Sequence, residues 1–254
     1  VISAYNEEKN IKDCMASVKE LATEIIVVDN SSQDDTSKIA KSLGATVYSQ
    51  KNDPLKIDLQ KNYGFSRASQ PWILSLDADE RVSPKLAEEI KKTVALDENV
   101  DGYYIPRKNI IFGKWIRHSI WWPDYQLRLF RKGRGRFVYA SVHEPIHIRG
   151  ETKHLSEPLV HFNYDSISQF VRRMDSIYTE SEARKIISER KKTHWIDAVR
   201  MPSSDFIKTY FFQKGYRDGL HGLVLSILQA FYMFLVFAKV WEKQGFYARD
   251  EKEV

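Results

Sequence analysis

The sequence predicts an α/β fold with a mostly parallel central sheet flanked by helices, followed by a C-terminal helical extension. Three observations predict it: apolar runs with strand composition alternate with helical patterns, polar clusters follow the apolar runs, and a helical pattern fills the last part of the chain. With 254 residues, 43% of them hydrophobic, the chain is long enough for one large domain with an appendage.

The first expected element is the end of a strand at residues 1–3, so the chain is expected to start inside that strand. Asn6 followed by two acidic residues predicts the start of a helix, because Asn caps helices and acidic side chains favour the first turn. Ile11, Met15 and Val18 continue at helical spacing. The unbroken apolar run within residues 24–29 predicts a second strand, buried on both faces.

Four further elements complete the expected first half. A short helix should follow the polar loop at residues 30–35 and end at Gly44, the residue type that closes helices in a left-handed conformation. Residues 46–49 and 72–77 are expected to form the third and fourth strands. Ser83 and Pro84 predict another helix, with proline at its first position.

Polar residues follow three of these strands, at residues 4–6, 29–32 and 77–79. Ligands of open parallel sheets bind beyond the carboxyl ends of the strands. Asp77 and Asp79 suit Mg²⁺ or Mn²⁺ on a diphosphate, because these ions take oxygen ligands and need few from the protein. Acidic residues that merely end a strand are the alternative at this point. The chain has no glycine-rich phosphate loop, so metal and side chains would hold the pyrophosphate.

Taken together, these motifs resemble the family 2 inverting glycosyltransferases of the GT-A fold. The motifs are residues 3–8, 27–32 with 34–36, 62–64 and 76–80. Residues 121–131, followed by 142–144, resemble a bacterial subgroup that includes the lipopolysaccharide core glucosyltransferases. The resemblance implies a metal-dependent hexosyltransferase that moves a hexose, glucose being the expected sugar, from a UDP-sugar to a hydroxyl of a surface-glycan precursor such as lipopolysaccharide core.

The same resemblance implies a domain plan. It has a GT-A catalytic domain at residues 1–164, with a nucleotide-binding half at 1–101 and an acceptor half at 102–164, and a C-terminal helical region at 165–254.

It also implies the site residues. The nucleotide-sugar would meet Ala4, Tyr5, Asn6, Asp29, Lys61, Arg67, Asp77 and Ala78. Asp79 would bind the metal directly, with Asp77 beside it. The acceptor would meet Trp121, Trp122, Tyr125 and Arg128. The alternatives are ordinary packing for Tyr5 and a solvated face for Lys61 and Arg67.

An inverting transfer also needs a carboxylate that takes the proton of the acceptor hydroxyl. The candidates are Glu144 and Asp124. Glu144 is favoured, because the family places its base in an acidic dipeptide at this point of the chain. His143 departs from the usual first residue of that dipeptide, so the assignment stays open. Asp124 could instead orient the acceptor or pair with Arg128.

A zinc-protease pattern and a single cysteine are also present, and neither is expected to be catalytic. Residues 143–147 satisfy the His-Glu-x-x-His pattern of zinc proteases, but β-like neighbours and Pro145 argue against the helix that this pattern needs. Cys14 is the single cysteine and is expected to fill the core. A lone cysteine cannot form an internal disulfide, which is compatible with the cytoplasm, and no signal peptide is visible.

The net charge of +5 is unevenly placed, since residues 107–136 carry nine Lys or Arg against one Asp or Glu. Aromatic residues interleave this basic block, which suits a glycan or glycolipid acceptor or an anionic membrane. An ordinary solvated face is the alternative. No RNA-binding signature accompanies the block, so no nucleic-acid partner is expected.

The last third of the chain predicts helices at residues 166–189 and 220–241, joined in part by a polar connector at 190–204. The second run contains polar residues and falls short of a clean membrane span. Its aromatic and basic flanks favour an interfacial helix, with a buried helix or a homo-oligomer contact as alternatives. We therefore expect a cytoplasmic enzyme at the inner face of the bacterial membrane. Rival hypotheses are another nucleotide such as GDP, a lipid-phosphate acceptor, or a catalytically silent binding module.

Overall fold

A computed structural model of the protein describes residues 1–53, 57–96, 99–138, 145–189 and 194–245. The chain divides into two compact units, each built from two segments. The first unit contains residues 1–110 and 122–163, and the second contains residues 111–121 and 164–254.

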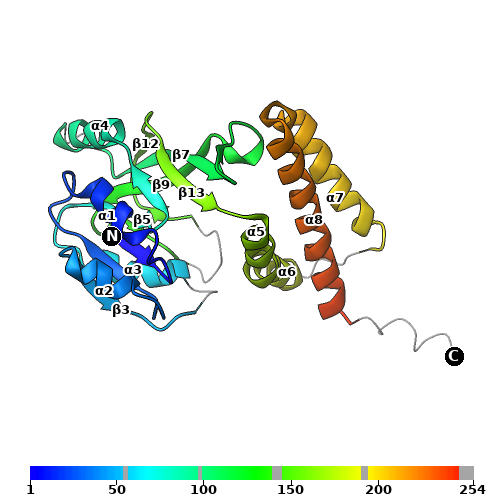
Figure 1. Cartoon of the computed structure of the whole chain (residues 1–254), viewed down its shortest axis with the longest axis horizontal. Coiled ribbons are helices and arrows are strands. Elements are labelled where there is room, and N and C mark those ends of the chain that lie inside the picture. The colour runs from blue at the N-terminus through cyan, green and yellow to red at the C-terminus, as the bar shows by residue number, and fades with distance from the viewer. Residues whose placement is uncertain (54–56, 97–98, 139–144, 190–193, 246–254) are drawn as a thin grey trace. The chain divides into compact units, whose positions relative to one another are not determined.

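A four-stranded, fully parallel sheet lies in the first unit, with strand order β3-β2-β1-β5 (Figure 1). Its strands are β1 (Ile2–Ala4), β2 (Ile26–Asp29), β3 (Thr46–Ser49) and β5 (Leu76–Asp77). The helices beside it are α1 (Ile11–Val18), α2 (Thr36–Ser42) and α3 (Ile57–Arg67). Side chains of α1 and α2 share one buried cluster with β1, and α3 shares another with β2, so the sheet is covered on both faces. The predicted α/β class with a parallel sheet is confirmed.

The predicted helix start at Asn6 is wrong, because α1 begins at Ile11. Asn6 has a φ of +54° and belongs to the loop that leaves β1. Two other predicted ends are confirmed. Gly44 follows α2 with a φ of +87°, and Ser83 caps α4 (Pro84–Ala95) by accepting a hydrogen bond of 3.1 Å from the Leu86 N–H.

A larger, mainly antiparallel sheet completes the first unit in the order β4-β9-β7-β13-β6, with β12 also paired to β7. Its strands are β4 (Trp72–Leu74), β6 (Glu80–Val82), β7 (Gly102–Ile111), β9 (Asp124–Arg131), β12 (Thr152–His154) and β13 (Leu159–Tyr164). Strands β10 (Gly135–Arg136) and β11 (His147–Ile148) form a separate pair.

The expected single strand at residues 72–77 is two strands that belong to different sheets. β4 pairs antiparallel with β9, whereas β5 pairs parallel with β1. The change occurs at Ser75, whose N–H donates to the Arg128 carbonyl at 2.7 Å, while the Leu76 N–H donates to the Val1 carbonyl at 2.9 Å. The segment that ends in Asp77 therefore connects both sheets.

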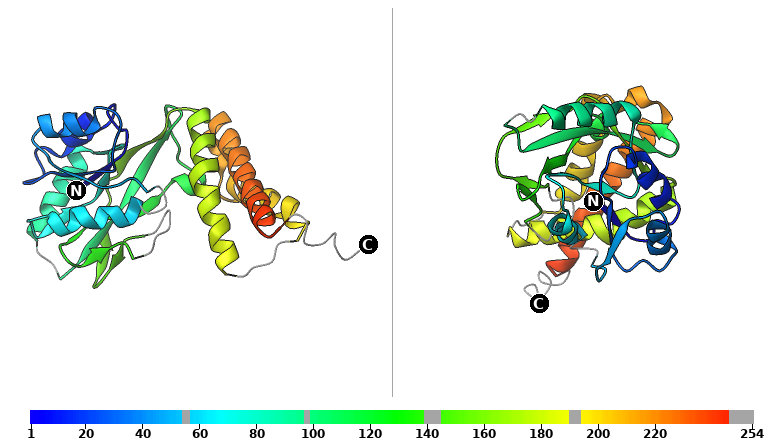
Figure 2. Two further views of the ribbon diagram at one scale, coloured as in Figure 1. Left: turned by 90° about the horizontal axis from the view of Figure 1, so that it is seen from below. Right: turned by 90° about the vertical axis from the view of Figure 1, so that its left-hand side faces the viewer.

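The second unit is largely helical, and Figures 1 and 2 show α7 and α8 side by side. Its elements are β8 (Lys114–Trp115), η1 (Ser119–Trp121), α5 (Ile167–Arg173), η2 (Met174–Tyr178), α6 (Thr179–Ser188), α7 (Asp197–Phe206), η3 (Ile207–Phe212), η4 (Gly215–Asp218) and α8 (Leu220–Lys243). Its core joins Ile111 and Ile116 to residues of α5 and α8. The predicted helix at 166–189 is confirmed, but the expected connector is wrong in its second half, where α7 begins.

Helix α8 has 24 residues and a mean hydropathy of 2.0 over its most apolar window. It is therefore long and apolar enough to cross a membrane, which differs from the expectation that this run falls short. Core helices of soluble proteins meet the same criteria.

Candidate active site

The three predicted polar clusters lie at one edge of the parallel sheet. β1 is the central neighbour of both β2 and β5, with Ala4 opposite Asp29 and Ser3 opposite Asp77. Because all these strands run in the same direction, their carboxyl ends bring Tyr5, Asp29 and Asp77 to the same side of the sheet.

The loops after β1 and β2 are fastened to each other. The Asn6 N–H donates to Ser32 Oγ at 2.9 Å, and Asn6 Oδ1 accepts from the Gln33 N–H at 2.8 Å. Asp29 is buried, and its Oδ2 accepts from the Ser32 N–H at 3.3 Å. Its Oδ1 accepts no hydrogen bond from the residues that the structure describes. Beside this buried acceptor, the Tyr5 side chain is 40% exposed.

Asp77 is held by two cations. Lys61 Nζ lies 2.7 Å from Oδ1, and Arg128 donates to Oδ2 at 2.7 Å. Burial alone would raise the pKa of Asp77, but the Lys61 ammonium and the Arg128 guanidinium hold it well below its usual value. Lys61 is buried, so the alternative that it lies on a solvated face is wrong.

Asp124, at the start of β9, is surrounded by donors. Arg107 donates to Oδ2 at 2.8 Å through Nε, and its second nitrogen lies 2.6 Å from the same oxygen. Asn109 also donates to Oδ2, at 3.2 Å, and Gln126 donates to Oδ1 at 2.8 Å. Burial would raise the pKa of Asp124, but Arg107 and the two amides keep it lowered. The alternative pairing of Asp124 with Arg128 is wrong.

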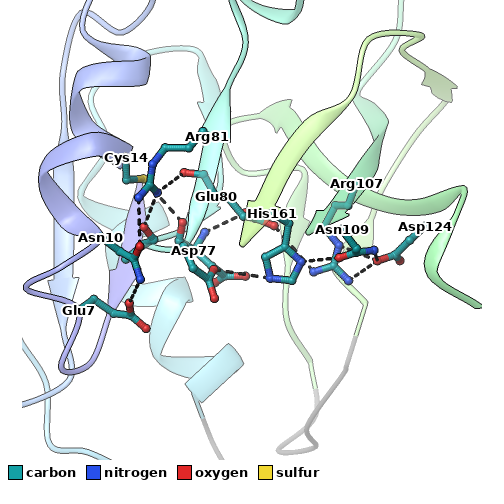
Figure 3. Close-up of polar contacts among 12 residues, drawn as sticks. Glu7, Asn10, Cys14, Asp77, Glu80, Arg81, Arg107, Asn109, Asp124 and His161 are labelled. Atoms are coloured by element: carbon teal, nitrogen blue, oxygen red, sulfur yellow. Dashed lines mark hydrogen bonds and ion pairs between the residues drawn. The ribbon is translucent and has the colours of Figure 1, made fainter. Parts of the chain in front are cut away.

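His161 on β13 lies between Asp79 and Asn109, and Figure 3 shows its contact with Asn109 and that of Asn109 with Asp124. Its Nδ1 lies 2.6 Å from Asn109 Oδ1, and its Nε2 lies 3.6 Å from Asp79 Oδ1. Asn109 thus links His161 to Asp124, and the row of contacts runs from the Asp-x-Asp motif to the first residue of β9.

Sequence reasoning missed four site residues. Asn109 and His161 belong to this row, Arg107 holds Asp124, and Glu80 Oε1 accepts from Arg128 at 2.6 Å. A period of two could have found some of them, because alternate residues of a strand share one face. Arg107 and Asn109 alternate on β7, and Asp124, Gln126 and Arg128 alternate on β9. Polar residues at such spacing in largely apolar strands indicate a polar face. His161 alternates with Asn163 on β13 in the same way, and both are buried.

The other predicted residues lie elsewhere or make other contacts. The Arg67 guanidinium lies 4.8 Å from the Tyr63 ring centroid and donates to the Tyr63 hydroxyl at 2.9 Å. Trp121 belongs to the second unit, where its ring meets that of Tyr164. Tyr125 is exposed and meets the His154 ring edge-on, with 4.7 Å between centroids.

The remaining predicted residues are Ala78, Trp122 and Glu144. Ala78 is buried, Trp122 precedes a cis peptide bond to Pro123, and Glu144 lies outside the described residues. His147, the last residue of the zinc-protease pattern, is in strand β11.

The donor set near Asp79 fits a divalent cation that brings further ligands of its own. No group of three or more His, Cys, Asp or Glu side chains arranged for a metal occurs within the described ranges. His161 Nε2 lies on the side of Asp79, 3.6 Å from its Oδ1. An imidazole nitrogen and a carboxylate are both metal ligands, and substrate phosphate oxygens would complete the shell of an ion held between them.

Comparison with known proteins gives consistent similarities. Residues 1–174 match the model of the family described as glycosyl transferase family 2. The lipopolysaccharide core biosynthesis glycosyltransferase LpsC of Rhizobium meliloti is 26% identical over 98% of this chain and 93% of its own. An uncharacterized glycosyltransferase of Rickettsia bellii is 31% identical over 95% of this chain and 86% of its own.

Among solved structures, S. aureus TarS residues 1–349 in complex with UDP-GlcNAc is similar over 98% of this chain and 86% of that one. The TM-score is 0.52 at 15% sequence identity, so this similarity concerns the fold alone.

Proposed function

This chain belongs to glycosyl transferase family 2, and we propose that it moves a hexose, glucose in the first instance, from a UDP-sugar to a hydroxyl of a bacterial surface-glycan precursor such as lipopolysaccharide core. Membership of the family and the glycosyltransferase relatives make it a transferase with the GT-A fold. The observation that carries the proposal is the convergence of Tyr5, Asp29 and Asp77 at one sheet edge, next to Asp79.

On the donor side, the proposal assigns the nucleoside to Tyr5, Asn6 and Asp29. The buried Asp29 Oδ1 is an acceptor whose burial is unfavourable until a donor such as a ribose hydroxyl reaches it. Tyr5 offers an exposed ring for a base. TarS, which has the same fold, binds UDP-GlcNAc, and this supports a UDP-sugar as the first donor to test.

For the metal, Mg²⁺ or Mn²⁺, we assign Asp79 as the direct ligand and His161 as its neighbour in the shell, with Asp77 beside them. The bound ion would offset the charge that develops on the UDP leaving group. Lys61 and Arg128 both engage Asp77, and we assign them to holding that carboxylate. Arg67 stays a predicted diphosphate contact.

For the base, we favour Glu144 over Asp124. A general base works best when its pKa lies near the working pH. Asp124 has a lowered pKa and both its oxygens accept hydrogen bonds, so it is a poor proton acceptor and a good anchor for β9. Glu144 would take the proton of the acceptor hydroxyl as that oxygen attacks the anomeric carbon from the face opposite to UDP, which inverts the configuration.

For the acceptor half, residues 102–164 of the predicted plan, exposed Tyr125 is the best candidate to stack on a sugar ring, and Trp122 stays a prediction. Trp121 stays a prediction. Arg128 is buried in contact with Asp77 and Glu80, and we assign it no acceptor contact.

We also propose that the helical region, residues 165–254 of the predicted plan, makes peripheral contact with an anionic membrane at the inner face. Large apolar residues are exposed along α7, α8 and the segments flanking α7: Trp195, Ile196, Val199, Ile207, Phe211, Phe212, Leu220, Ile227, Phe231, Phe234 and Trp241. Exposed cations accompany them at Arg200, Lys208, Lys214 and Arg217. Rings and cations together suit a headgroup layer.

Vesicle flotation tests this contact. Binding to vesicles that contain phosphatidylglycerol, but weaker binding to pure phosphatidylcholine, is expected, with a clear loss for Phe211→Ser/Phe212→Ser. Leu96→Ser is the matched control, because Leu96 is a similarly exposed apolar residue of the first unit. Vesicle binding that the Phe variant does not change contradicts the proposal. A dimer in light scattering that the same variant dissociates would favour a homo-oligomer contact.

Calorimetric titration with UDP and with GDP, each with Mn²⁺ and with EDTA, tests the donor and the metal. We expect UDP to bind only with metal, and Asp79→Ala to remove that binding while the protein stays folded. Tight binding of GDP instead would replace the UDP assignment. If the folded protein bound neither nucleotide with metal, a catalytically silent module would be the better hypothesis. Detection of a transferred hexose on core oligosaccharide, rather than on a lipid phosphate, then tests the acceptor.

A further inference from the structure

A cluster of opposite charges surrounds the end of β5, and it is layered. Its members are Lys61, Asp77, Glu80, Arg107, Asp124 and Arg128. The Asp77 side chain is 30% exposed, whereas those of Lys61 and Arg128 are 6% exposed and that of Glu80 has no exposed surface. An accessible carboxylate thus has buried partners behind it.

Arg128 and Glu80 hold Asp77 through both its side chain and its main chain. One nitrogen of Arg128 donates to Asp77 Oδ2 at 2.7 Å and to Glu80 Oε1 at 2.6 Å. The other Glu80 oxygen, Oε2, accepts from the Asp77 N–H at 2.9 Å. The carboxylate can neither rotate nor shift along the strand without breaking one of these bonds.

Stability alone does not explain such a pair. A buried ion pair is often no more stabilising than apolar residues of similar volume, because desolvation of both charges offsets their attraction. Removal of one partner is strongly destabilising, since the other charge stays buried. Glu80 and Arg128 are buried directly behind the accessible Asp77 carboxylate. This arrangement therefore points to a role for the pair in what Asp77 binds at the surface.

We propose that Glu80 and Arg128 are positioning residues, which fix the Asp77 carboxylate in the orientation that nucleotide-sugar binding requires and do not touch the substrate. The proposal rests on the function proposed above. Arg107 extends the same arrangement, because its NH1 lies 3.8 Å from Glu80 Oε1 while its other nitrogens hold Asp124. The buried pair of Glu80 and Arg128 therefore contacts Asp77 directly, and it is connected through Arg107 to Asp124 at the start of β9.

The test compares single variants with a charge-balanced double variant. Glu80→Gln and Arg128→Met each leave a net charge behind, whereas the double variant leaves none. The matched control is Glu180→Gln/Arg184→Met on α6, which removes a more exposed Glu–Arg pair with 2.7 Å between Arg184 Nε and Glu180 Oε1, together with a 3.0 Å contact of Glu180 with Lys243. Each protein is examined for its thermal midpoint, its affinity for UDP with Mn²⁺, and its kcat and KM for the UDP-sugar.

The double variant is expected to unfold near the wild-type temperature and yet to bind UDP with Mn²⁺ about 10-fold to 100-fold more weakly, as is typical when a partner of a ligating group is lost. Arg128→Lys should recover part of the affinity, because a single nitrogen makes both contacts. The control pair should bind UDP like the wild type. If a single variant does not fold, the UDP affinity of the double variant relative to wild type still tests the proposal.

Two results overturn the proposal in distinguishable ways. Wild-type affinity in a folded double variant means that the pair only neutralises buried charge, and the proposed function then stands without it. Failure of the wild-type protein itself to bind UDP with metal removes the proposed function, and the positioning role with it.

Discussion

Asp124→Asn separates an anchoring carboxylate from a catalytic base. In the wild-type protein, Oδ2 receives Arg107 Nε at 2.8 Å and Asn109 at 3.2 Å, and Oδ1 receives Gln126 at 2.8 Å. An asparagine keeps one acceptor oxygen and gains an NH₂ group. In either orientation of the amide, this NH₂ group faces an N–H donor from which the wild-type carboxylate accepts a hydrogen bond.

The expected loss of stability follows from those contacts. Hydrogen bonds to a charged group contribute about 1.5–3 kcal/mol each. The side chains of Asp124 and Arg107 are 17% and 19% exposed, so water and rearrangement recover part of the loss. We therefore expect the free energy of unfolding to fall by about 2–4 kcal/mol, from the loss of one or two charge-assisted bonds. Asp35→Asn, in an exposed ion pair with 3.8 Å to Lys38, should change it by less than about 1 kcal/mol.

Urea unfolding followed by tryptophan fluorescence measures the stability of each variant, and turnover is then measured at a temperature where all are folded. Folded Asp124→Asn should keep kcat within about tenfold of wild type, whereas Glu144→Gln should lose about 10² to 10⁴. The opposite pattern would refute this reasoning: an Asp124→Asn protein as stable as wild type but at least a hundredfold slower makes Asp124 the base. Normal turnover by Glu144→Gln would remove the preferred assignment.

Three further predictions concern stability and reactivity. Cys14 is fully buried and burial raises the pKa of its thiol, so Ellman's reagent should not react with it until the protein unfolds; a rapid reaction in the native state would contradict this. Gly222→Ala should destabilise by more than about 2 kcal/mol in thermal or urea unfolding, because a Cβ there would lie 1.8 Å from the Gly215 carbonyl oxygen, and an unchanged midpoint would exclude that close approach. The lowered pKa of Asp77 means that its charged form stabilises the folded protein; this contribution is complete above the usual pKa of 3.8 and is lost as pH falls through the folded-state pKa. The difference in unfolding free energy between wild type and Asp77→Asn should therefore shrink in acid. A difference that grew in acid would contradict this.

Local patterns predicted the parallel half of the fold well. Strand β3 was predicted with the observed bounds, and the caps at Gly44 and Ser83 were found, because turn and cap preferences depend on neighbouring residues only. The order of strands brought together the clusters after β1, β2 and β5 by a general rule of parallel sheets.

Long-range pairing explains what the sequence did not show. Nothing local marks Ser75 as the point where the chain changes sheets, since that change is made by Arg128 and Val1, which are far away in sequence. Likewise, the first part of α7 was taken for a connector because residues 190–204 are largely polar, and Pro202 and two serines do lower the helix propensity there. Its packing against α8 outweighs that propensity.

The residues of the candidate site also divide into those that a local motif reveals and those that only long-range pairing brings together. Asp77 and Asp79 stood out because they share one motif. His161 on β13 approaches Asp79, and Arg107 on β7 approaches the neighbouring Glu80, and only tertiary structure brings these residues together. For Asp124, the choice between base and anchor depended on which donors surround it, and that depends on the pairing of β7 with β9.

Because each unit is assembled from two separate segments, the order of synthesis matters for this chain. Ile111 and Ile116 leave the ribosome well before Phe170 and Leu225, against which they pack in the second unit. During that interval they are apolar residues without their native neighbours, a state that favours aggregation or binding of chaperones. A chain cut after residue 163 would keep this state permanently. Soluble expression should therefore depend on the helices that come last, even for the half of the protein that carries the carboxylates.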